Sequence, residues 1–385
     1  MASPPKFIKV TYAGDKPDLP MKANEGLVVI RDMKLKDVSE SYNLGKKLFS
    51  FSSSLSRTFD RFVVIGGYSN DPDYCLVAEE GDKMIGFAIG TTIAKSELIG
   101  YIGWVAVDPE YQRRKIGSML VTRVEERMQQ NGITEFLVDT PVSNLTAIKF
   151  LTQLGYGAPV KQVYMSHNFI EKPEGIPINN PVSKHSTHQH APEDVSPLTQ
   201  VRVPNVESQK PDVNVKIRLM EISDIWPVFQ IGEAVFTESA VNLYRFWDEA
   251  QVTDAYESDG ELALVALIDD KVVGFALGST LERIEQKFGY LIWLAVDPST
   301  HGMGIGTLLY NAYESLIKEI FDDIDTIIID TQASNKGAIR FFSRIGFGIT
   351  DTFIYICKKV GQEEKASNDA VQQVMDLIEA QTLKE

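Results

Sequence analysis

The chain has 385 residues, 44% hydrophobic and 24% charged, a composition typical of globular proteins and a length that suggests two or more domains. Its net charge of −15 disfavours nucleic acid and anionic membranes as partners and favours cationic substrates. It has two cysteines in unrelated contexts, no charged-then-apolar leader and no apolar run near the ~20 residues of a membrane span. These features predict a cytoplasmic protein without disulfides.

The first part of the chain predicts a loose arm followed by an α/β domain. Residues 1–25 are polar and carry prolines, which is typical of an arm without its own core. Apolar spacing and turn signals then predict a first strand, a helix, a hairpin and a buried strand that ends at Asp108-Pro109. We expect these at about Val28–Arg31, Leu35–Leu48, Tyr74–Ala78 with Lys83–Thr91, and Tyr101–Val107.

The same order of motifs returns later in the chain. The recurring pairs include Ile30-Arg31 with Ile217-Arg218, Leu76-Val77-Ala78 with Leu264-Val265-Ala266, Gly86-Phe87-Ala88 with Gly274-Phe275-Ala276, Tyr101-Ile102-Gly103-Trp104 with Tyr290-Leu291-Ile292-Trp293, and Asp139-Thr140 with Asp330-Thr331. An internal repeat of this kind predicts two copies of one domain. We place them at residues 26–170 and 213–361, and call them the first and the second copy.

Two further segments lack the pattern of a packed core. Residues 171–212 are rich in Pro, Ser, Asn and Gln, which predicts a flexible linker. Its three histidines, His185, His188 and His190, have no carboxylate or cysteine to complete a rigid site, so we expect no metal. Residues 362–385 contain an amphipathic stretch, which predicts a helical tail that docks on the body or on a partner.

The second copy contains a strand, a glycine-rich turn and an amphipathic helix in succession. The apolar run Tyr290–Val296 ends at Asp297-Pro298, and the turn His301–Gly306 leads into a helix over Ile305–Ile320. Glycines permit positive φ, and a helix start presents free N–H groups, so the turn predicts an anion site for phosphate. It lacks the Gly-Lys-Ser/Thr ending of a P-loop and the dinucleotide G-x-G-x-x-G, and a merely structural turn remains an alternative.

In this context the turn resembles the acyl-CoA site of the GNAT superfamily of N-acetyltransferases. The family pattern is Gln/Arg-x-x-Gly-x-Gly/Ala, whose amides bind the CoA pyrophosphate. A second stretch, from Asp330 through Asn335 to Gly346-Phe347, resembles the family's strand, Asn-x-x-Ala, helix and Gly-Phe ending. The resemblance implies an α/β (α+β) fold of two tandem GNAT-like domains, each with a mixed, mostly antiparallel sheet flanked by helices. It also implies acetyl-CoA as cofactor and a primary amine of a peptide, a protein or a small molecule as acceptor.

The resemblance assigns CoA-binding candidates in both copies. In the second copy, where His301 replaces the family's Gln or Arg, they are Leu294, Ala295, Val296, His301, Gly302, Met303, Gly304, Ile305, Gly306, Thr307, Asn335 and Phe342. In the first copy they are Val105, Val107, Gln112, Arg113, Arg114, Lys115, Gly117 and Asn144.

The two loops predict unequal binding of CoA. Lys115 stands where a glycine is expected, and its side chain would crowd a close contact between backbone and phosphate. The three basic residues Arg113, Arg114 and Lys115 either hold phosphates by charge or form a solvated basic turn. We therefore expect tighter CoA binding, and catalysis, mainly in the second copy.

The candidate general base is Asp330, at the predicted end of a strand. Acetyl transfer to an amine near pKa 10 requires loss of its proton. The second copy locally resembles ribosomal-protein alanine N-acetyltransferases, which place a catalytic glutamate at this position. The alternative is that Asp330 only caps the following turn. Asp139 is the counterpart in the first copy. In the family a tyrosine in the helix after the Asn commonly acts as the general acid. Phe342 and Leu151 occupy its position here and cannot donate a proton, so Tyr355 is the candidate substitute for the acid.

The acceptor site is expected between the first helices and the hairpin. In the second copy this segment combines aromatic and acidic residues, which suits either an amine cation or an ordinary amphipathic helix. They are Phe236, Glu238, Tyr244, Phe246, Trp247, Asp248 and Glu249. The alternative to an enzyme is a non-catalytic acyl-CoA sensor or assembly module, and the sequence sets no oligomeric state.

Overall fold

The structure is a computed structural model that describes residues 27–49, 59, 61–93, 99–169, 214–236, 247–283 and 286–361. In the first copy the elements are β1 (Val28–Asp32), α1 (Asp37–Phe49), α2 (Arg61–Asn70), β2 (Cys75–Glu80), β3 (Lys83–Thr92), β4 (Ile99–Val107), α3 (Ile116–Gln130), β5 (Glu135–Pro141), α4 (Leu145–Gln153) and β6 (Gly157–Asn168). In the second copy they are β7 (Lys216–Leu219), α5 (Ile225–Val235), α6 (Glu249–Ser258), β8 (Ala263–Ile268), β9 (Lys271–Arg283), β10 (Gln286–Val296), α7 (Ile305–Ile320), β11 (Ile324–Gln332), α8 (Lys336–Arg344) and β12 (Gly348–Lys359).

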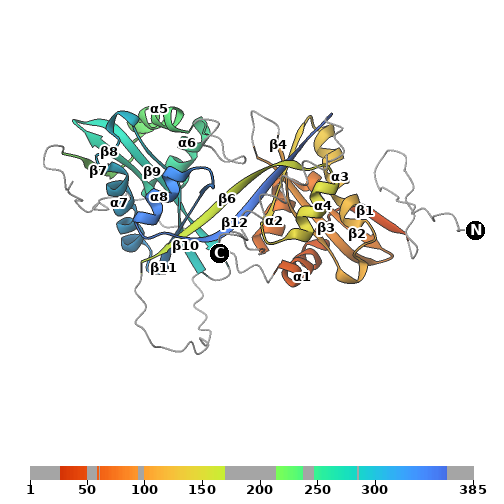
Figure 1. The fold of residues 1–385 in the computed structure, drawn as a ribbon. Coiled ribbons are helices and arrows are strands. Elements are labelled where there is room, and N and C mark those ends of the chain that lie inside the picture. Colours follow the sequence, from red (N-terminus) through yellow and green to blue (C-terminus); the bar gives the residue numbers. More distant parts are fainter. Residues whose placement is uncertain are drawn as a thin grey trace, which may run out of the picture.

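All these strands form one sheet, in the order β1-β2-β3-β4-β5-β12-β6-β11-β10-β9-β8-β7 (Figure 1). The neighbours β4–β5 and β10–β11 are parallel, and the other pairs are antiparallel. Helices flank each copy, so the predicted α+β class with a mixed, mostly antiparallel sheet is confirmed. The predicted hairpin, the two buried strands and the helix start at Ile305 are confirmed too.

Each copy gives its last strand to the other. Strand β6 pairs with β11 of the second copy, and β12 pairs with β5 of the first. The two exchanged strands also pair with each other, and Figure 1 shows them side by side as they cross between the halves. The repeat in the sequence cannot reveal this exchange, because β6 and β12 each have the pattern of a strand that fits either sheet.

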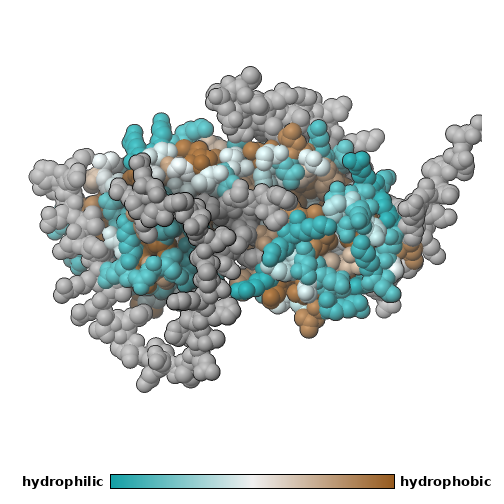
Figure 2. Space-filling view, turned by 90° about the horizontal axis from the view of Figure 1, so that it is seen from below, coloured by the Kyte–Doolittle hydropathy of each residue, from teal (hydrophilic) through white to brown (hydrophobic). Residues whose placement is uncertain are grey.

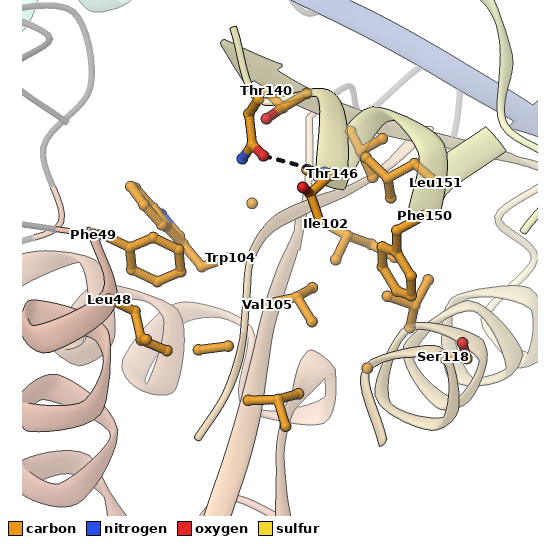
Figure 3. Close-up of a pocket in the computed structure, with 18 of the residues that line it drawn as sticks. Leu48, Phe49, Ile102, Trp104, Val105, Ser118, Thr140, Thr146, Phe150 and Leu151 are labelled. Atoms are coloured by element: carbon orange, nitrogen blue, oxygen red, sulfur yellow. Dashed lines mark hydrogen bonds between the residues drawn. The ribbon is translucent and has the colours of Figure 1, made fainter. Parts of the chain in front are cut away.

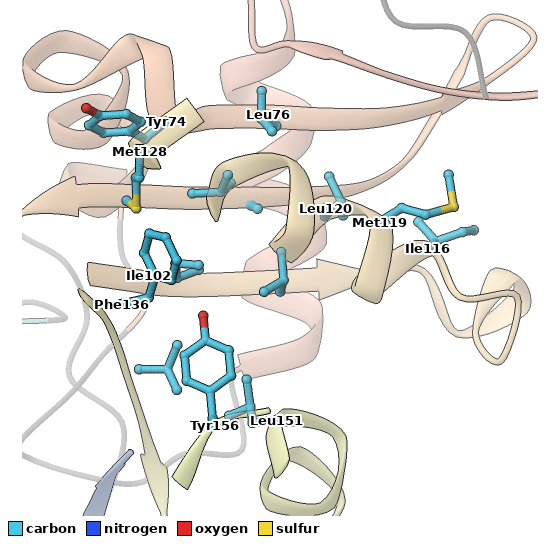
Figure 4. Packing of buried hydrophobic residues seen from close by; sticks show 14 of the residues in the cluster. Tyr74, Leu76, Ile102, Ile116, Met119, Leu120, Met128, Phe136, Leu151 and Tyr156 are labelled. Carbon is cyan, nitrogen blue, oxygen red and sulfur yellow. The ribbon is translucent and has the colours of Figure 1, made fainter. Parts of the chain in front are cut away.

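The exchanged strands belong to the hydrophobic core that receives them. In the first copy, α3 buries Ile116, Leu120, Val124 and Met128 along one face of the helix (Figure 4). Ile354 and Ile356 of β12 are fully buried in that same core, and Met165 of β6 is buried in the second core. Burial of one such side chain contributes about 1.5–3 kcal/mol, so the exchange stabilises both halves.

Polar contacts anchor the exchanged strands at matching places. Lys358 of β12 donates to Glu125 of α3 at 2.6 Å, and Glu125 also accepts from Tyr156 at 2.8 Å. Burial, then the neighbouring carboxylate, raises the pKa of Tyr156 well above its ordinary value. In the second half, His167 of β6 hydrogen-bonds Tyr310 of α7 at 2.7 Å. Each exchanged strand is thus held to the long helix of the other copy.

The visible surface of both halves is dominated by polar side chains (teal), with apolar ones scattered among them (Figure 2). Within the described ranges no helix is both long and apolar enough to cross a bilayer. The predicted arm at 1–25, the linker at 171–212 with its histidines and the tail at 362–385 lie outside the described residues. The domain boundaries remain predictions.

The strand exchange predicts that neither half is stable alone. We expect residues 1–170 and 213–385, produced separately, to aggregate or to form strand-swapped homodimers, because each piece lacks a strand of its own sheet and exposes long edges. Produced together, the pieces should co-purify as one complex with the melting temperature close to that of the intact chain. A single half that is monomeric and cooperatively folded by sedimentation and circular dichroism would contradict this expectation.

Candidate functional site

In both copies two parallel strands separate at their carboxyl ends. The register of β4 with β5 pairs Ile99–Tyr101 with Glu135–Leu137, although the strands continue to Val107 and Pro141. The register of β10 with β11 ends at Tyr290 and Ile328, although these strands continue to Val296 and Gln332. Each copy therefore has a gap between strands that leads toward the predicted anion loop.

In the first copy this region is a cavity of about 840 Å³. Figure 3 shows Trp104, Phe49 and Leu48 on one side of it and Ser118, Phe150 and Leu151 on the other. The predicted candidates Val105, Val107, Gln112, Arg113, Lys115, Gly117, Asn144 and Asp139 all line it. Among the lining residues the charged ones are Arg113, Lys115 and Asp139, so the cavity combines two cations from the loop with one carboxylate from β5.

The loops of the two copies have the same backbone shape despite their different residues. Arg113 and Lys115 both have φ of 63°, while Gly302 and Gly304 have φ of 80° and 82°. A Cβ built at Gly302 or Gly304 meets nothing within 4 Å, so this turn has room for side chains. The free protein thus accommodates positive φ at Lys115, and crowding of the phosphate contact by its side chain stays a prediction. The cost is about 1 kcal/mol or more for a non-glycine residue at positive φ.

The first residue of each loop fastens the turn to the preceding strand. Gln112 Nε2 donates to the carbonyl of Val107 at 3.1 Å, and His301 Nε2 lies 3.0 Å from the carbonyl of Val296. Since a carbonyl only accepts, this contact favours the tautomer with the proton on Nε2. His301, which replaces the family's Gln or Arg, thus makes the same kind of contact as Gln112.

The three basic residues of the first loop do not act together. Arg114 forms an ion pair with Glu80 at 2.5 Å and lies over the ring of Tyr111. It is absent from the cavity lining, so its predicted phosphate contact is not supported. Arg113 and Lys115 remain as the cations of the loop that face the cavity.

The predicted carboxylates occupy equivalent places beside the strand gaps. Tyr101 Oη donates to Asp139 Oδ1, and Tyr290 Oη donates to Asp330 Oδ1, each at 2.5 Å. Asp330 Oδ2 also accepts from Gln162 Nε2 at 2.6 Å. Strand β11 continues past Asp330 to Gln332, so the expectation that Asp330 ends its strand is wrong.

The asparagines, and not Asp330, cap the helices that follow. Asn144 accepts from the amide of Ala147 at 3.1 Å and Asn335 from that of Ala338 at 3.0 Å. The interpretation of Asp330 as a cap is therefore wrong, because its side chain is directed to Tyr290 and Gln162.

Tyr355 lies on a strand paired with the first copy, although it is not among the residues that line the first cavity. It is directly opposite Asp139 in the pairing of β12 with β5, while Tyr164 is opposite Asp330 in the pairing of β6 with β11. The hydroxyls of Tyr164 and Tyr355 are 3.1 Å apart. Assignment of Tyr355 to the second copy is thus corrected by the strand exchange.

The predicted acceptor residues of the second copy are largely structural. Trp247 stacks on Phe275 and packs against Trp293, each with ring centroids 5.2 Å apart, and Phe236 contacts the same cluster. Asp248 caps α6 by accepting from the amide of Gln251. Phe236 lies directly after α5, and Trp247 and Asp248 lie directly before α6, so these three are not on the face of an amphipathic helix. Glu249 is exposed in α6, and Glu238, Tyr244 and Phe246 lie outside the described residues.

The remaining second-copy candidates lie where their counterparts line the first cavity. They are Leu294, Ala295 and Val296 at the end of β10, Ile305, Gly306 and Thr307 at the start of α7, and Phe342 in α8. Met303, the counterpart of Arg114, instead packs against the second hydrophobic core. Phe342 packs against Phe347 in the second core, 5.2 Å between ring centroids, while its counterpart Leu151 lines the cavity.

Sequence reasoning missed Tyr101, Tyr290, Gln162 and Phe353. The two tyrosines stand at the same place in the repeat, which is a signal that was available in the sequence. Gln162 and Phe353 lie on the exchanged strands, so no local pattern connects them with the sites that they contact.

Comparison with known proteins gives matches to both copies. The model of the acetyltransferase (GNAT) family matches residues 39–156 and 230–347, together more than half of the chain. Human N-alpha-acetyltransferase 30 is 27% identical over 123 residues, 31% of this chain and 29% of that protein. The Dictyostelium discoideum protein of the same name is 33% identical over 86 residues, 22% of this chain and 46% of that protein. The chain thus spans less than half the length of either, and neither relative points to ribosomal-protein alanine acetyltransferases in particular.

Two solved structures share the arrangement of both copies. A GCN5-related N-acetyltransferase from Sphaerobacter thermophilus aligns over 86% of this chain and 95% of its own, with a TM-score of 0.60 and 16% identity. A tandem GNAT protein from the clavulanic acid biosynthesis pathway aligns over 88% of this chain and 100% of its own, with a TM-score of 0.59 and 12% identity. These likenesses concern the fold. The chain belongs to the GNAT acetyltransferase family, whose domain it contains twice.

Proposed function

We propose that this protein is an acetyl-CoA-dependent N-acetyltransferase that acts on a primary amine, with one acyl-transfer site in each copy. The observation that carries the proposal is the cavity of the first copy. It joins the anion loop, the separated strands and the carboxylate of Asp139 in one space of about 840 Å³.

The residues of this cavity fit acetyl-CoA. The loop amides at the start of α3, together with Arg113, suit the pyrophosphate, because a helix start and a cation favour negative charge. The largely apolar strand Ile102–Val107 and Phe150 line the space for the acyl-bearing arm. When bound, acetyl-CoA supplies an acetyl group on a thiol that is a good leaving group.

The chain's own residues handle the amine and its proton. Asp139 accepts the proton of the alkylammonium, directly or through one water, so that the nitrogen can attack. Tyr101, whose hydroxyl donates to Asp139, holds the carboxylate in one orientation. Trp104 and Phe49 line the same cavity and offer aromatic faces to the cationic acceptor before its proton is lost.

The second copy repeats the essential parts. Asp330 with Tyr290 reproduces the pair of Asp139 with Tyr101, and the loop of Gly302 and Gly304 has the same backbone shape. The sequence favours the second copy for catalysis because of its glycines, and the cavity favours the first. We therefore assign acetyl transfer to both. The names of the N-alpha-acetyltransferase relatives make peptide α-amines the first acceptor class to test.

The test is release of free thiol from acetyl-CoA in the presence of a library of peptides and small amines. We expect release with at least one peptide bearing a free α-amine, and loss of it when that amine is blocked. Binding of CoA without thiol release from any amine would overturn the enzyme and favour the acyl-CoA sensor. Absence of both binding and release would overturn the acyl-CoA site itself.

A further inference from the structure

The cavity of the first copy has lining residues on both faces of the sheet. Val105 and Val138 pack in the core under α3, and their chain neighbours Trp104 and Asp139 line the cavity as well. Because successive residues of a strand point to opposite faces, the cavity reaches through the gap between β4 and β5. Since the anion loop leads into α3, an acyl-CoA bound there enters on that face, and the acceptor reaches the acyl group from the opposite one.

The opposite face of the cavity, which we call the acceptor face, is apolar around one carboxylate. Among its described residues Asp139 alone is ionisable. Phe49 packs edge-on against Trp104 with 4.9 Å between ring centroids, and Figure 3 shows both on this side with Leu48. Besides Asp139, the residues of the acceptor face are Leu48, Phe49, Trp104, Ala106, Pro141 and Phe353.

Phe353 comes to the acceptor face from the second copy. On the exchanged strand β12 it lies directly opposite Pro141, which shares a face of β5 with Asp139 two residues earlier. Phe353 is 2% exposed and packs edge-on against Tyr164, with 5.4 Å between ring centroids. The first copy therefore does not encode the ring beside its own carboxylate.

The second site has two amides where the first has this apolar pair. Gln332 follows Asp330 by two residues, as Pro141 follows Asp139. Gln162 of the exchanged strand β6 lies directly opposite Gln332, and its Nε2 donates to Asp330 at 2.6 Å. The two sites thus share the carboxylate and differ in the pair of residues beside it.

An apolar wall beside the reacting amine discriminates between acceptors by the group that the amine carries. A large apolar group that lies against Phe49, Trp104 and Phe353 is removed from water, which is favourable. A polar group of similar size would give up hydrogen bonds to water for contacts with apolar rings. Where two amides replace the ring and the proline, this discrimination should be weaker.

We propose that the first site selects a primary amine with a large apolar group on the adjacent carbon, such as a peptide that begins with leucine, and that Phe353 of the exchanged strand determines this selection. The inference rests on the proposed function, whose acceptor it narrows. Through the strand exchange, the second copy sets which acceptors the first copy accepts.

The experiment compares two peptides that differ only in the first residue, leucine or asparagine, whose side chains have a similar shape. In the full chain, Asp330→Asn leaves the first site as the working one, and Asp139→Asn leaves the second. We expect kcat/KM for the leucine peptide to exceed that for the asparagine peptide by about tenfold or more at the first site, and by less at the second.

Variants of the apolar pair test its role in the Asp330→Asn background. Phe353→Gln, which introduces the side chain found in the second site, should remove most of the preference, whereas Phe353→Leu, which stays apolar, should keep most of it. Pro141→Gln changes the half-buried partner and should also lower the preference, so the inference can be tested even if Phe353→Gln does not fold. Melting temperatures identify any variant whose fold is disturbed.

A binding measurement separates this inference from the proposed function. Calorimetry with CoA-loaded protein and the same two peptides measures the preference without acetyl transfer. A wild type that releases no thiol would overturn the proposed function, and the binding preference, with its loss in Phe353→Gln, would still decide the inference. Thiol release with no preference at the first site, or a preference unchanged in folded Phe353→Gln, would overturn the inference alone.

The same variant distinguishes the acceptor from the acyl chain as the group that lies on the acceptor face. We expect the effect of Phe353→Gln to depend on the peptide and to be the same with acetyl-CoA and butyryl-CoA. If the variant slows both peptides equally with acetyl-CoA and slows transfer from butyryl-CoA further, the apolar face holds the acyl chain, and the inference is overturned.

Discussion

The double variant Asp139→Asn/Asp330→Asn is expected to lower turnover by roughly 10²-fold or more, because neither site then has a group that accepts the proton of the amine. Asparagine has nearly the same shape, and its carbonyl can still accept from Tyr101 or Tyr290. At the second site Gln162 can turn its own carbonyl toward the new amide. The fold and the packing should therefore remain.

The single variants measure how much of the turnover each copy contributes. Each is expected to retain the turnover of the untouched site, measured with saturating acetyl-CoA and an accepted peptide from pH 6 to 9. The affinity for CoA should barely change, because both residues lie on strands and not in the anion loops. Wild-type turnover of the double variant across this pH range would remove both aspartates from the mechanism, and an equal loss of CoA affinity would assign them to binding.

Gly304→Lys, which places the first copy's residue in the second loop, is expected to weaken CoA binding at that loop by roughly 1.5–3 kcal/mol, a factor of about 10 to 150. The reason is the loss of a close contact between the backbone and a charged phosphate. The free protein should fold, because a Cβ at Gly304 meets nothing within 4 Å and Lys115 already has φ of 63° in the equivalent turn. A loss of affinity would then report on the ligand and not on the fold.

A matched control exists in the hairpin between β2 and β3. Gly81 has φ of +62° and no atom within 4 Å of a Cβ, so Gly81→Lys adds the same charge and a similar backbone strain away from both loops. It should leave CoA binding unchanged. Calorimetry must use the full chain, because each half carries the strand that completes the sheet of the other half. The tighter phase of the isotherm should disappear in Gly304→Lys. An unchanged isotherm would show that this loop does not hold the pyrophosphate.

The sequence by itself determined the parts of this protein that depend on local patterns. The alternating and continuous apolar runs predicted the hairpin of β2 and β3 and the strands β4 and β10, and the apolar face over Ile305–Ile320 predicted α7. The repeat predicted two copies, and the loop and Asn-x-x-Ala motifs identified the family. These features could be predicted because the period of a strand, the period of a helix and the residues of a turn all depend on positions close together in the sequence.

The tertiary structure decided which residues meet at each site. Strands β6 and β12 have compatible patterns, so only the packing of the whole sheet determines that each completes the other copy. That exchange moved Tyr355 to Asp139 and brought Gln162 to Asp330, contacts between residues far apart in the chain. The tertiary structure also decided the backbone conformation at Lys115, for which the residue type predicted only that the side chain crowds the phosphate contact. The surrounding fold imposes positive φ at a cost of about 1 kcal/mol or more, which is small compared with the packing of α3 on its sheet.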